Sequence, residues 1–440
     1  MSQSLRELGM DLVADGNWGR ALGVFAEAVR RQPADHRSRM LAARCYAKLG
    51  ENERAVTVLH ACAEGLLRRD YLLSAIAACR QALPLAPREK RIRETLARIH
   101  ARAARGIGGR AAGPPPLPPE SLYDGKVDAD LMSLQGAELA DQAIHVLAAV
   151  DASASSDPSA RPPLPLFADL ERDAFVDLVE LVDYRELQGG EVICHEGQAS
   201  DRIFVLVAGK AEVTRQVGGE AKTLAFLGGG SIFGEISMLT GAAPTSTITA
   251  VSECDLLEIE REDLNQLART WPSVPAVLAT FAQQRMARNL IATSPLFAQV
   301  PEGERAELLG RFEFRAVGPG ERVISEGEPV SGLVLVLAGE LVVQKEDPSG
   351  GVVSLSILRE GDIAGEIALL KGLRATATVA ASRKTAIAVL ARAPFDALLK
   401  QHPKIRDYLD GLSERRLKQI GEAMRPVEIL DADELVVESP

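Results

Sequence analysis

The sequence is poor in the residues that build metal sites and disulfides. It has 440 residues but only six histidines and five cysteines, and no two cysteines form a Cys-x-x-Cys pair. An odd number of scattered cysteines predicts neither a disulfide framework nor a zinc site. Gly-x-Ser-x-Gly turns and Walker-type phosphate loops are also missing from the sequence. We therefore expect no metal, no catalytic residue and no enzymatic activity.

Long apolar runs are missing as well. No uncharged stretch approaches the ~18 apolar residues that a membrane-spanning helix needs. The first segment, MSQSLRELGMDLVADG, is amphipathic and lacks the apolar centre of a signal peptide. We expect no membrane attachment and a cytoplasmic location.

Positive charge is concentrated in the first quarter of the chain. Residues 1–110 contain 20 Lys/Arg and 11 Asp/Glu and carry +9, whereas residues 111–440 carry −20. Since opposite charges attract, the basic end can bind the acidic remainder or an acidic partner. A solvated arginine-rich helical surface explains the same count, and both interpretations stay open.

Residues 1–104 are predicted to be entirely helical. Apolar residues recur there at spacings of three and four, and Gly16, Gly50, Pro33 and Pro87 divide the segment into helices of hairpin length. A period of 34 residues resembles that of tetratricopeptide repeats, whose pattern falls here on Leu5, Leu8, Gly9, Leu12, Ala21, Phe25, Ala28 and Pro33. The resemblance implies stacked hairpins with a concave surface that binds a peptide or a helix of a protein partner. A helical bundle without a partner is the alternative.

Residues 105–165 are predicted to form a linker rich in proline, glycine and alanine. Within the linker, apolar residues at Leu131, Leu134, Leu139, Ile144 and Leu147 allow one amphipathic helix. Such a helix would either dock on a partner or pack on its neighbours in the chain.

A longer repeat begins near residue 166. Phe167, Gly190-Glu191 and Glu196-Gly197 recur 130 residues later, at Phe297, Gly320-Glu321 and Glu326-Gly327. Each copy opens with a helical stretch, continues with short alternating strands separated by glycines, and closes with helices, which predicts a jelly-roll-like β-roll. The predicted fold class is therefore multidomain α+β, with helical repeats followed by two β-rolls that are each flanked by helices. The predicted domains are residues 1–104, 105–165, 166–292 and 293–424, with an acidic tail at 425–440.

One motif in each copy is typical of a ligand site. FGEISMLTGAAPTSTITA (233–250) and AGEIALLKGLRATATVAA (364–381) both place a Gly-Glu turn between two strands of the roll. This motif resembles the phosphate-binding cassette of cyclic nucleotide-binding domains, which occur in tandem in kinase regulatory subunits. The resemblance implies a ligand such as cyclic AMP or cyclic GMP, whose ribose hydroxyl is bound by Glu235 or Glu366. It assigns ligand contacts to Gly234, Glu235, Ile236, Ser237, Thr245, Ser246 and Thr247 in the first copy, and to Gly365, Glu366, Ile367, Ala368, Arg374 and Thr376 in the second.

Both copies depart from the family at the arginine that neutralises the cyclic phosphate. Pro244 stands at that position in the first copy and Ala375 in the second, where Arg374 precedes it by one residue. Loss of a buried cation removes several kcal/mol of binding free energy, by analogy with buried ion pairs, and ~1.4 kcal/mol is a tenfold change in affinity. We expect weak binding at the first site and better binding at the second.

Related classes with the same roll fit less well. Cupin enzymes need clustered histidines, whereas His195 alone lies in a predicted roll. Activators that bind DNA carry a further helix-turn-helix motif, whereas an acidic tail, the wrong sign for DNA, follows the last predicted helix here. Residues 105–165 also lack the Arg-Arg-x-Ser/Ala segment of kinase inhibitors.

The sequence therefore predicts a non-enzymatic signalling adaptor or sensor. Its helical repeats would bind a protein partner, and its two rolls would bind a cyclic nucleotide weakly. The alternative is a structural interaction scaffold with ligand-free rolls, in which Glu235 and Glu366 only satisfy backbone donors.

Overall fold

A computed structural model describes residues 4–104, 134–150, 164 and 166–423, apart from positions 199, 218, 242, 295, 298, 299, 348 and 349. The chain forms two compact units, Met1–Leu278 and Ala279–Pro440, which are considered separately. The division lies at residue 278, whereas the sequence placed a boundary at 292. The predicted acidic tail and most of the predicted linker lie outside the described residues.

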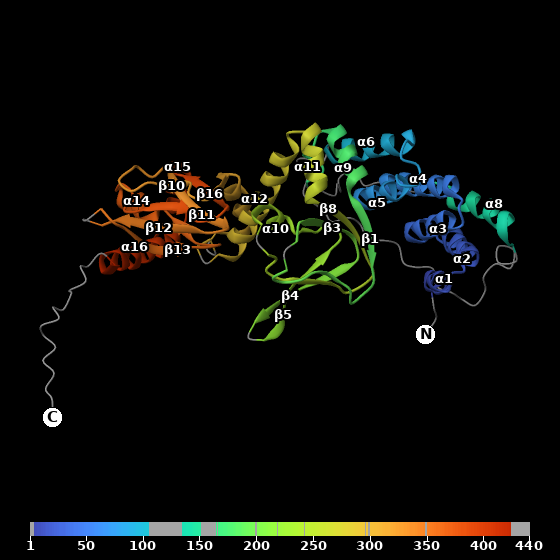
Figure 1. Ribbon diagram of the computed structural model, residues 1–440, viewed down its shortest axis with the longest axis horizontal. Helices are drawn as coiled ribbons and strands as arrows, with labels where there is room; N and C mark the ends of the chain where they lie inside the picture. Colours follow the sequence, from blue (N-terminus) through green and yellow to red (C-terminus); the bar gives the residue numbers. More distant parts are fainter. Residues whose placement is uncertain are drawn as a thin grey trace, which may run out of the picture. The chain divides into compact units, whose positions relative to one another are not determined.

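The first unit begins with a stack of helical hairpins (Figure 1). Ser4 caps the first helix through a capping box with Glu7. Gly9 allows the first two helices to pack closely, because a Cβ atom there would lie 2.3 Å from the Phe25 ring. The hairpin helices are α1 (Leu5–Ala14), α2 (Trp18–Arg31), α3 (His36–Lys48), α4 (Asn52–Arg68), α5 (Leu72–Ala82) and α6 (Lys90–Ala104).

Helix α8 (Gly136–Leu147) packs against α2, α3 and α4. The Tyr46 hydroxyl donates to the Ala140 carbonyl, 2.6 Å away. The buried Arg39 side chain donates to the carbonyls of Leu147 and Ala149, at 2.9 and 2.6 Å, and so caps the carboxyl end of the helix. Over Gly136–Leu147 the predicted amphipathic helix is thus a helix that packs on its own chain, whereas Leu131 lies outside the described residues.

Roll A is a β-roll of two four-stranded antiparallel sheets, with strand orders β1-β8-β3-β6 and β2-β7-β4-β5. Alternating strands bury Leu187, Phe204, Leu206 and Leu256 between the two sheets. Helix α9 (Arg172–Leu181) precedes the roll, and α11 (Arg261–Thr270) and α12 (Val274–Thr293) follow it. The strands are β1 (Asp183–Leu187), β2 (Val192–Cys194), β3 (Arg202–Ala208), β4 (Lys210–Val217), β5 (Glu220–Gly228), β6 (Ile232–Phe233), β7 (Thr247–Ala250) and β8 (Cys254–Glu260).

Roll B, in the second unit, repeats this topology. Its sheets have the orders β14-β11-β16-β9 and β10-β15-β12-β13 and enclose a core of aliphatic side chains. Helix α13 (Glu302–Leu309) precedes the roll, and α15 (Arg392–Gln401) and α16 (Pro403–Ala423) follow it. The strands are β9 (Phe312–Val317), β10 (Arg322–Ile324), β11 (Gly332–Ala338), β12 (Leu341–Glu346), β13 (Val352–Leu358), β14 (Ile363–Ala364), β15 (Thr378–Ala381) and β16 (Thr385–Ala391).

These elements confirm the predicted fold class, namely helical repeats followed by two rolls with flanking helices. Within the described residues, no helix is both long enough and apolar enough to cross a membrane.

Candidate functional site

The Gly-Glu turn of roll B connects the short strand β14 to helix α14 (Glu366–Lys371). Gly365 has a φ of 89°, a left-handed conformation that side chains with a Cβ adopt at a cost. A Cβ there would lie 3.0 Å from Val330 Cγ1 and 3.1 Å from the Gly332 carbonyl oxygen. Glycine therefore allows α14 to begin directly against the sheet, which carries Glu366 into the interior of the roll.

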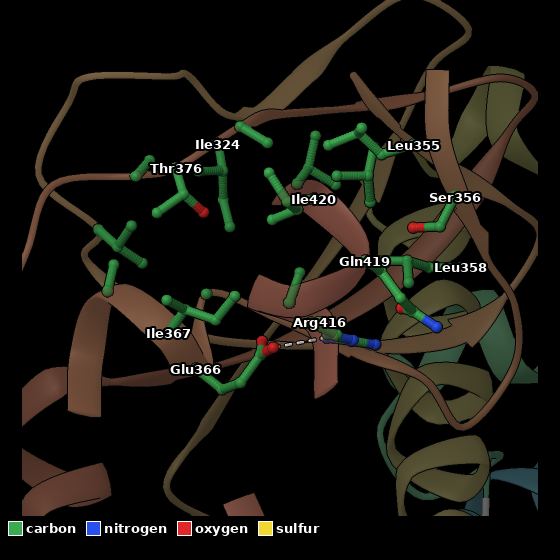
Figure 2. Close-up of a pocket in the computed structure, with 18 residues that line it drawn as sticks. Ile324, Leu355, Ser356, Leu358, Glu366, Ile367, Thr376, Arg416, Gln419 and Ile420 are labelled. Carbon is green, nitrogen blue, oxygen red and sulfur yellow. Dashed lines mark hydrogen bonds and ion pairs between the residues drawn. The ribbon is translucent and has the colours of Figure 1, made fainter. Parts of the chain in front are cut away.

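Glu366 is bound by an arginine of the closing helix. Its side chain is only 2% exposed, and its Oε1 accepts from Arg416 Nη1 at 2.7 Å. The same Nη1 donates to the Ile363 carbonyl, 2.8 Å away. Figure 2 shows the two side chains meeting at one end of a cavity. Helix α16 thus closes over the cassette and pairs with the carboxylate that the family resemblance assigns to ligand binding.

The cavity of roll B is small and mainly apolar. Its volume is about 80 Å³, whereas small-molecule sites measure roughly 300 Å³ or more. Arg416, Gln419 and Ile420 of α16 form part of its wall, so displacement of α16 would enlarge the cavity. Aliphatic side chains of one sheet (β10-β15-β12-β13), of the loop before β11 and of α14 line much of the rest: Ile324, Val330, Val343, Leu355, Leu358, Ile367 and Val379.

The segment that should supply the arginine turns its charge outward. Arg374 is exposed and its Nη1 donates to the Gly327 carbonyl at 2.9 Å. The cavity is instead lined by Ala375, Thr376 and Ala377, together with the predicted residues Gly365, Glu366, Ile367 and Ala368. Of the predicted residues of the second copy, the structure therefore brings together all except Arg374.

The cassette of roll A has the same backbone. Gly234 has a φ of 87° and begins helix α10 (Glu235–Thr240), with Glu235 and Ser237 buried and Ile236 half-buried. Pro244 stands where the family has arginine. Thr245 is exposed, Ser246 is half-buried, and Thr247 Oγ1 accepts from the Glu196 amide at 3.0 Å. Because Thr378 accepts in the same way from the Glu326 amide in roll B, this threonine position stabilises the roll itself.

Two equivalent arginines, one in each roll, bind the cassette helices from outside and were not predicted from the sequence. Arg261 Nη2 donates to the Met238 carbonyl at 2.5 Å in roll A, and Arg392 Nη2 donates to the Leu369 carbonyl at 3.5 Å in roll B. Arg261 also pairs with Asp201. The two arginines are 131 residues apart, like Gly234 and Gly365, so their spacing was a signal in the sequence.

Ion pairs connect the helical repeats to roll A. Arg37 of α3 pairs with Asp255 of β8, donates to Glu253 at 2.6 Å and lies 3.7 Å from Glu186. The Tyr184 hydroxyl donates to the same Asp255 carboxylate at 2.7 Å. Burial raises the pKa of Asp255, and the neighbouring Arg37 opposes the rise. Burial lowers the pKa of Arg37, but the surrounding acidic groups outweigh it and the net pKa is above the ordinary value.

Other arginines extend this contact. Arg44 of α3 pairs with Glu186, Arg80 of α5 donates to the Val182 carbonyl, and Arg93 of α6 pairs with Asp177 and Glu180. Helix α5 also packs against β1 and β3. Part of the basic surface of the repeats therefore binds the acidic roll of the same chain.

No group of three or more histidine, cysteine, aspartate or glutamate side chains is arranged to hold a metal ion in the described part of the chain.

Comparisons with known proteins agree with this architecture. The family model of the cyclic nucleotide-binding domain matches residues 184–270 and 314–402, and a tetratricopeptide repeat model matches residues 12–64. The chain is 28% identical over 234 residues to a cAMP-dependent protein kinase regulatory subunit of Yarrowia lipolytica, a match that covers 53% of this chain and 58% of the relative. It is 25% identical over 244 residues to cGMP-dependent protein kinase 2 of Homo sapiens, covering 55% and 30%.

A solved structure, the regulatory domain of Toxoplasma gondii PKA with cAMP, is 20% identical with a TM-score of 0.28 and covers 57% of this chain and 92% of that chain. The match spans about half the length of the first curated relative and less of the second. The chain thus carries two cyclic nucleotide-binding domains, rolls A and B, preceded by a tetratricopeptide-repeat region.

Proposed function

We propose that the chain is a non-enzymatic regulatory protein of the cytoplasm whose roll B binds a ligand of the cyclic nucleotide class, such as cyclic AMP or cyclic GMP, weakly. The observation that carries this proposal is the position of Glu366. Its carboxylate lies at the beginning of α14, in the wall of a cavity that the closing helix α16 completes through Arg416. A hydroxyl of a ligand can replace Arg416 at Glu366, because a hydroxyl and a guanidinium can both donate a hydrogen bond to the same carboxylate oxygen.

Ligand binding then changes the position of α16. Glu366 is shared between Arg416 and the ligand, and Gln419 and Ile420 of the same helix lie in the wall of the small cavity. The ligand therefore favours a conformation in which α16 is displaced or rearranged, because it binds that conformation more tightly than the closed one. Weak binding follows from the neutral Ala375 where the family places a cation.

The helical repeats serve as the contact to a protein partner in this proposal. Arg37, Arg44 and Arg80 of α3 and α5 already bind roll A, so a partner binds to other surfaces of the repeats or competes with roll A for these arginines. An acidic partner segment suits the second route, because it replaces the acidic residues of roll A.

Calorimetry with the full chain tests the ligand site. Cyclic AMP and cyclic GMP are titrated up to millimolar concentration into the wild type, the Glu366→Gln variant and the matched Glu235→Gln variant of roll A. We expect measurable heat that Glu366→Gln abolishes and Glu235→Gln largely retains. If neither nucleotide produces heat or a thermal shift in the wild type, roll B is not a cyclic nucleotide site and this proposal is refuted.

A further inference from the structure

We propose that the cavity of roll B selects an uncharged nucleoside over the corresponding 3′,5′-cyclic phosphate. This inference rests on the proposed function, since it concerns the same site, and it names the charge of the ligand. Among the described residues that line the cavity, only Glu366 and Arg416 carry charge. They pair with each other at 2.7 Å, so the wall of the cavity has no net charge.

The cationic side chains of Arg374 and Lys345, near the position where the family has arginine, bind other groups of the protein. Ala375 and Thr376 line the cavity there, and the Arg374 guanidinium donates to the Gly327 carbonyl on the exposed side of the loop. Lys345 is also engaged, because its ammonium pairs with Glu326 and donates to the Thr376 carbonyl at 2.9 Å. A phosphate beside Ala375 and Thr376 therefore has neither Arg374 nor Lys345 as a partner, and Arg416, the one cation among the described lining residues, is paired with Glu366. This arrangement opposes binding of an anion.

The remaining polar groups suit hydroxyls and amides. Glu366 is an acceptor for a sugar hydroxyl, and Thr376, Ser356 and Gln419 offer neutral donors and acceptors around the cavity, as Figure 2 shows. The aliphatic walls formed by Leu355, Leu358 and Ile420 suit the face of a base. A ligand with a vicinal diol, a flat apolar ring and no charge fits this combination.

Matched pairs of ligands test the inference on the unmodified full chain. Dissociation constants are measured by calorimetry for adenosine against cyclic AMP and for guanosine against cyclic GMP. We expect the nucleoside to bind at least tenfold more tightly than its cyclic phosphate in the pair that binds better. If the cyclic phosphate binds as tightly or more tightly, this inference is overturned while the proposed function stands. If none of the four compounds binds, both are overturned.

Two variants locate the selectivity. Ala375→Arg introduces a cation at the neutral position and is expected to improve the affinity for the cyclic phosphate at least tenfold without improving that for the nucleoside. Arg374→Gln is the matched control and should leave the ratio of the two affinities unchanged. A tenfold loss of cyclic phosphate affinity in Arg374→Gln would show that Arg374 binds the phosphate, and this would overturn the inference. Because Ala375 is buried, the Ala375→Arg result counts only if the variant unfolds at the same temperature as the wild type. If it does not, the ratio of the nucleoside and cyclic phosphate affinities of the wild type decides.

Discussion

Replacing Arg37 by alanine should destabilise the first unit strongly at neutral pH. The variant leaves Asp255 without its cation in a buried site, because the side chains of Arg37 and Asp255 are only 12% and 8% exposed. Removing one partner of a buried ion pair costs about 3–5 kcal/mol of unfolding free energy. Because the Tyr184 hydroxyl still donates to Asp255, we expect about 3 kcal/mol. The half-exposed Arg93, which also joins the repeats to roll A, is the control, and its alanine variant should lose at most about 1 kcal/mol.

The same variant has a defined pH dependence. Burial holds the pKa of Asp255 above its ordinary value in the folded chain, and loss of Arg37 raises this pKa further. A carboxyl with a raised folded-state pKa stabilises the fold below the unfolded pKa and loses this contribution as pH rises through the folded pKa. The deficit of Arg37→Ala should therefore be largest near pH 8 and shrink towards pH 5.

Urea unfolding followed by tryptophan fluorescence measures this deficit. Both tryptophans of the chain, Trp18 and Trp271, lie in the first unit, so their signal reports on it specifically. Adding Asp255→Asn to the Arg37→Ala chain should recover a large part of the loss at pH 8. An Arg37→Ala deficit below 1 kcal/mol, or one that grows on acidification, would refute the reasoning.

Two further predictions concern local geometry. Gly365→Ala should lower the unfolding free energy of roll B by more than Gly372→Ala, because Gly372 has a φ of 66° but open space around its Cβ position. The left-handed backbone alone costs about 1–2 kcal/mol in both variants. Equal losses in thermal unfolding would show that the contact with Val330 is unimportant. Arg39→Met should release the carboxyl end of α8 and speed proteolysis within residues 134–150 several-fold. Arg54 is more exposed, so Arg54→Met should change the rate of proteolysis little. Equal rates for both variants would contradict the capping role of Arg39.

The fold was accessible from the sequence because its signals are local and duplicated. Glycines at 234 and 365 precede glutamates in equivalent strand–helix turns, and both adopt the left-handed backbone that only glycine adopts easily. The helical repeats were recognisable from small residues such as Gly9, which allow close helix packing. These features depend on neighbours in the sequence, so composition and spacing are sufficient.

The partners of the cassette were not accessible in the same way. Arg416 lies 50 residues beyond Glu366, on a helix whose exposed face carries several other charged residues, and nothing local distinguishes it. The charge split between the repeats and the rolls predicted an attraction, but it did not identify Arg37 or Asp255. Such pairs form only when distant elements pack, so their identity depends on the three-dimensional fold.

The most direct test of the ligand site is the affinity of an Arg416→Met chain. Methionine keeps part of the stem of the side chain and removes the guanidinium that pairs with Glu366, and Arg415→Met is the control because the adjacent Arg415 is exposed. Calorimetry with adenosine should show about tenfold tighter binding in Arg416→Met, which corresponds to ~1.4 kcal/mol, and no change in Arg415→Met. Unchanged or weaker binding of adenosine in Arg416→Met would contradict the competition between Arg416 and ligand for Glu366.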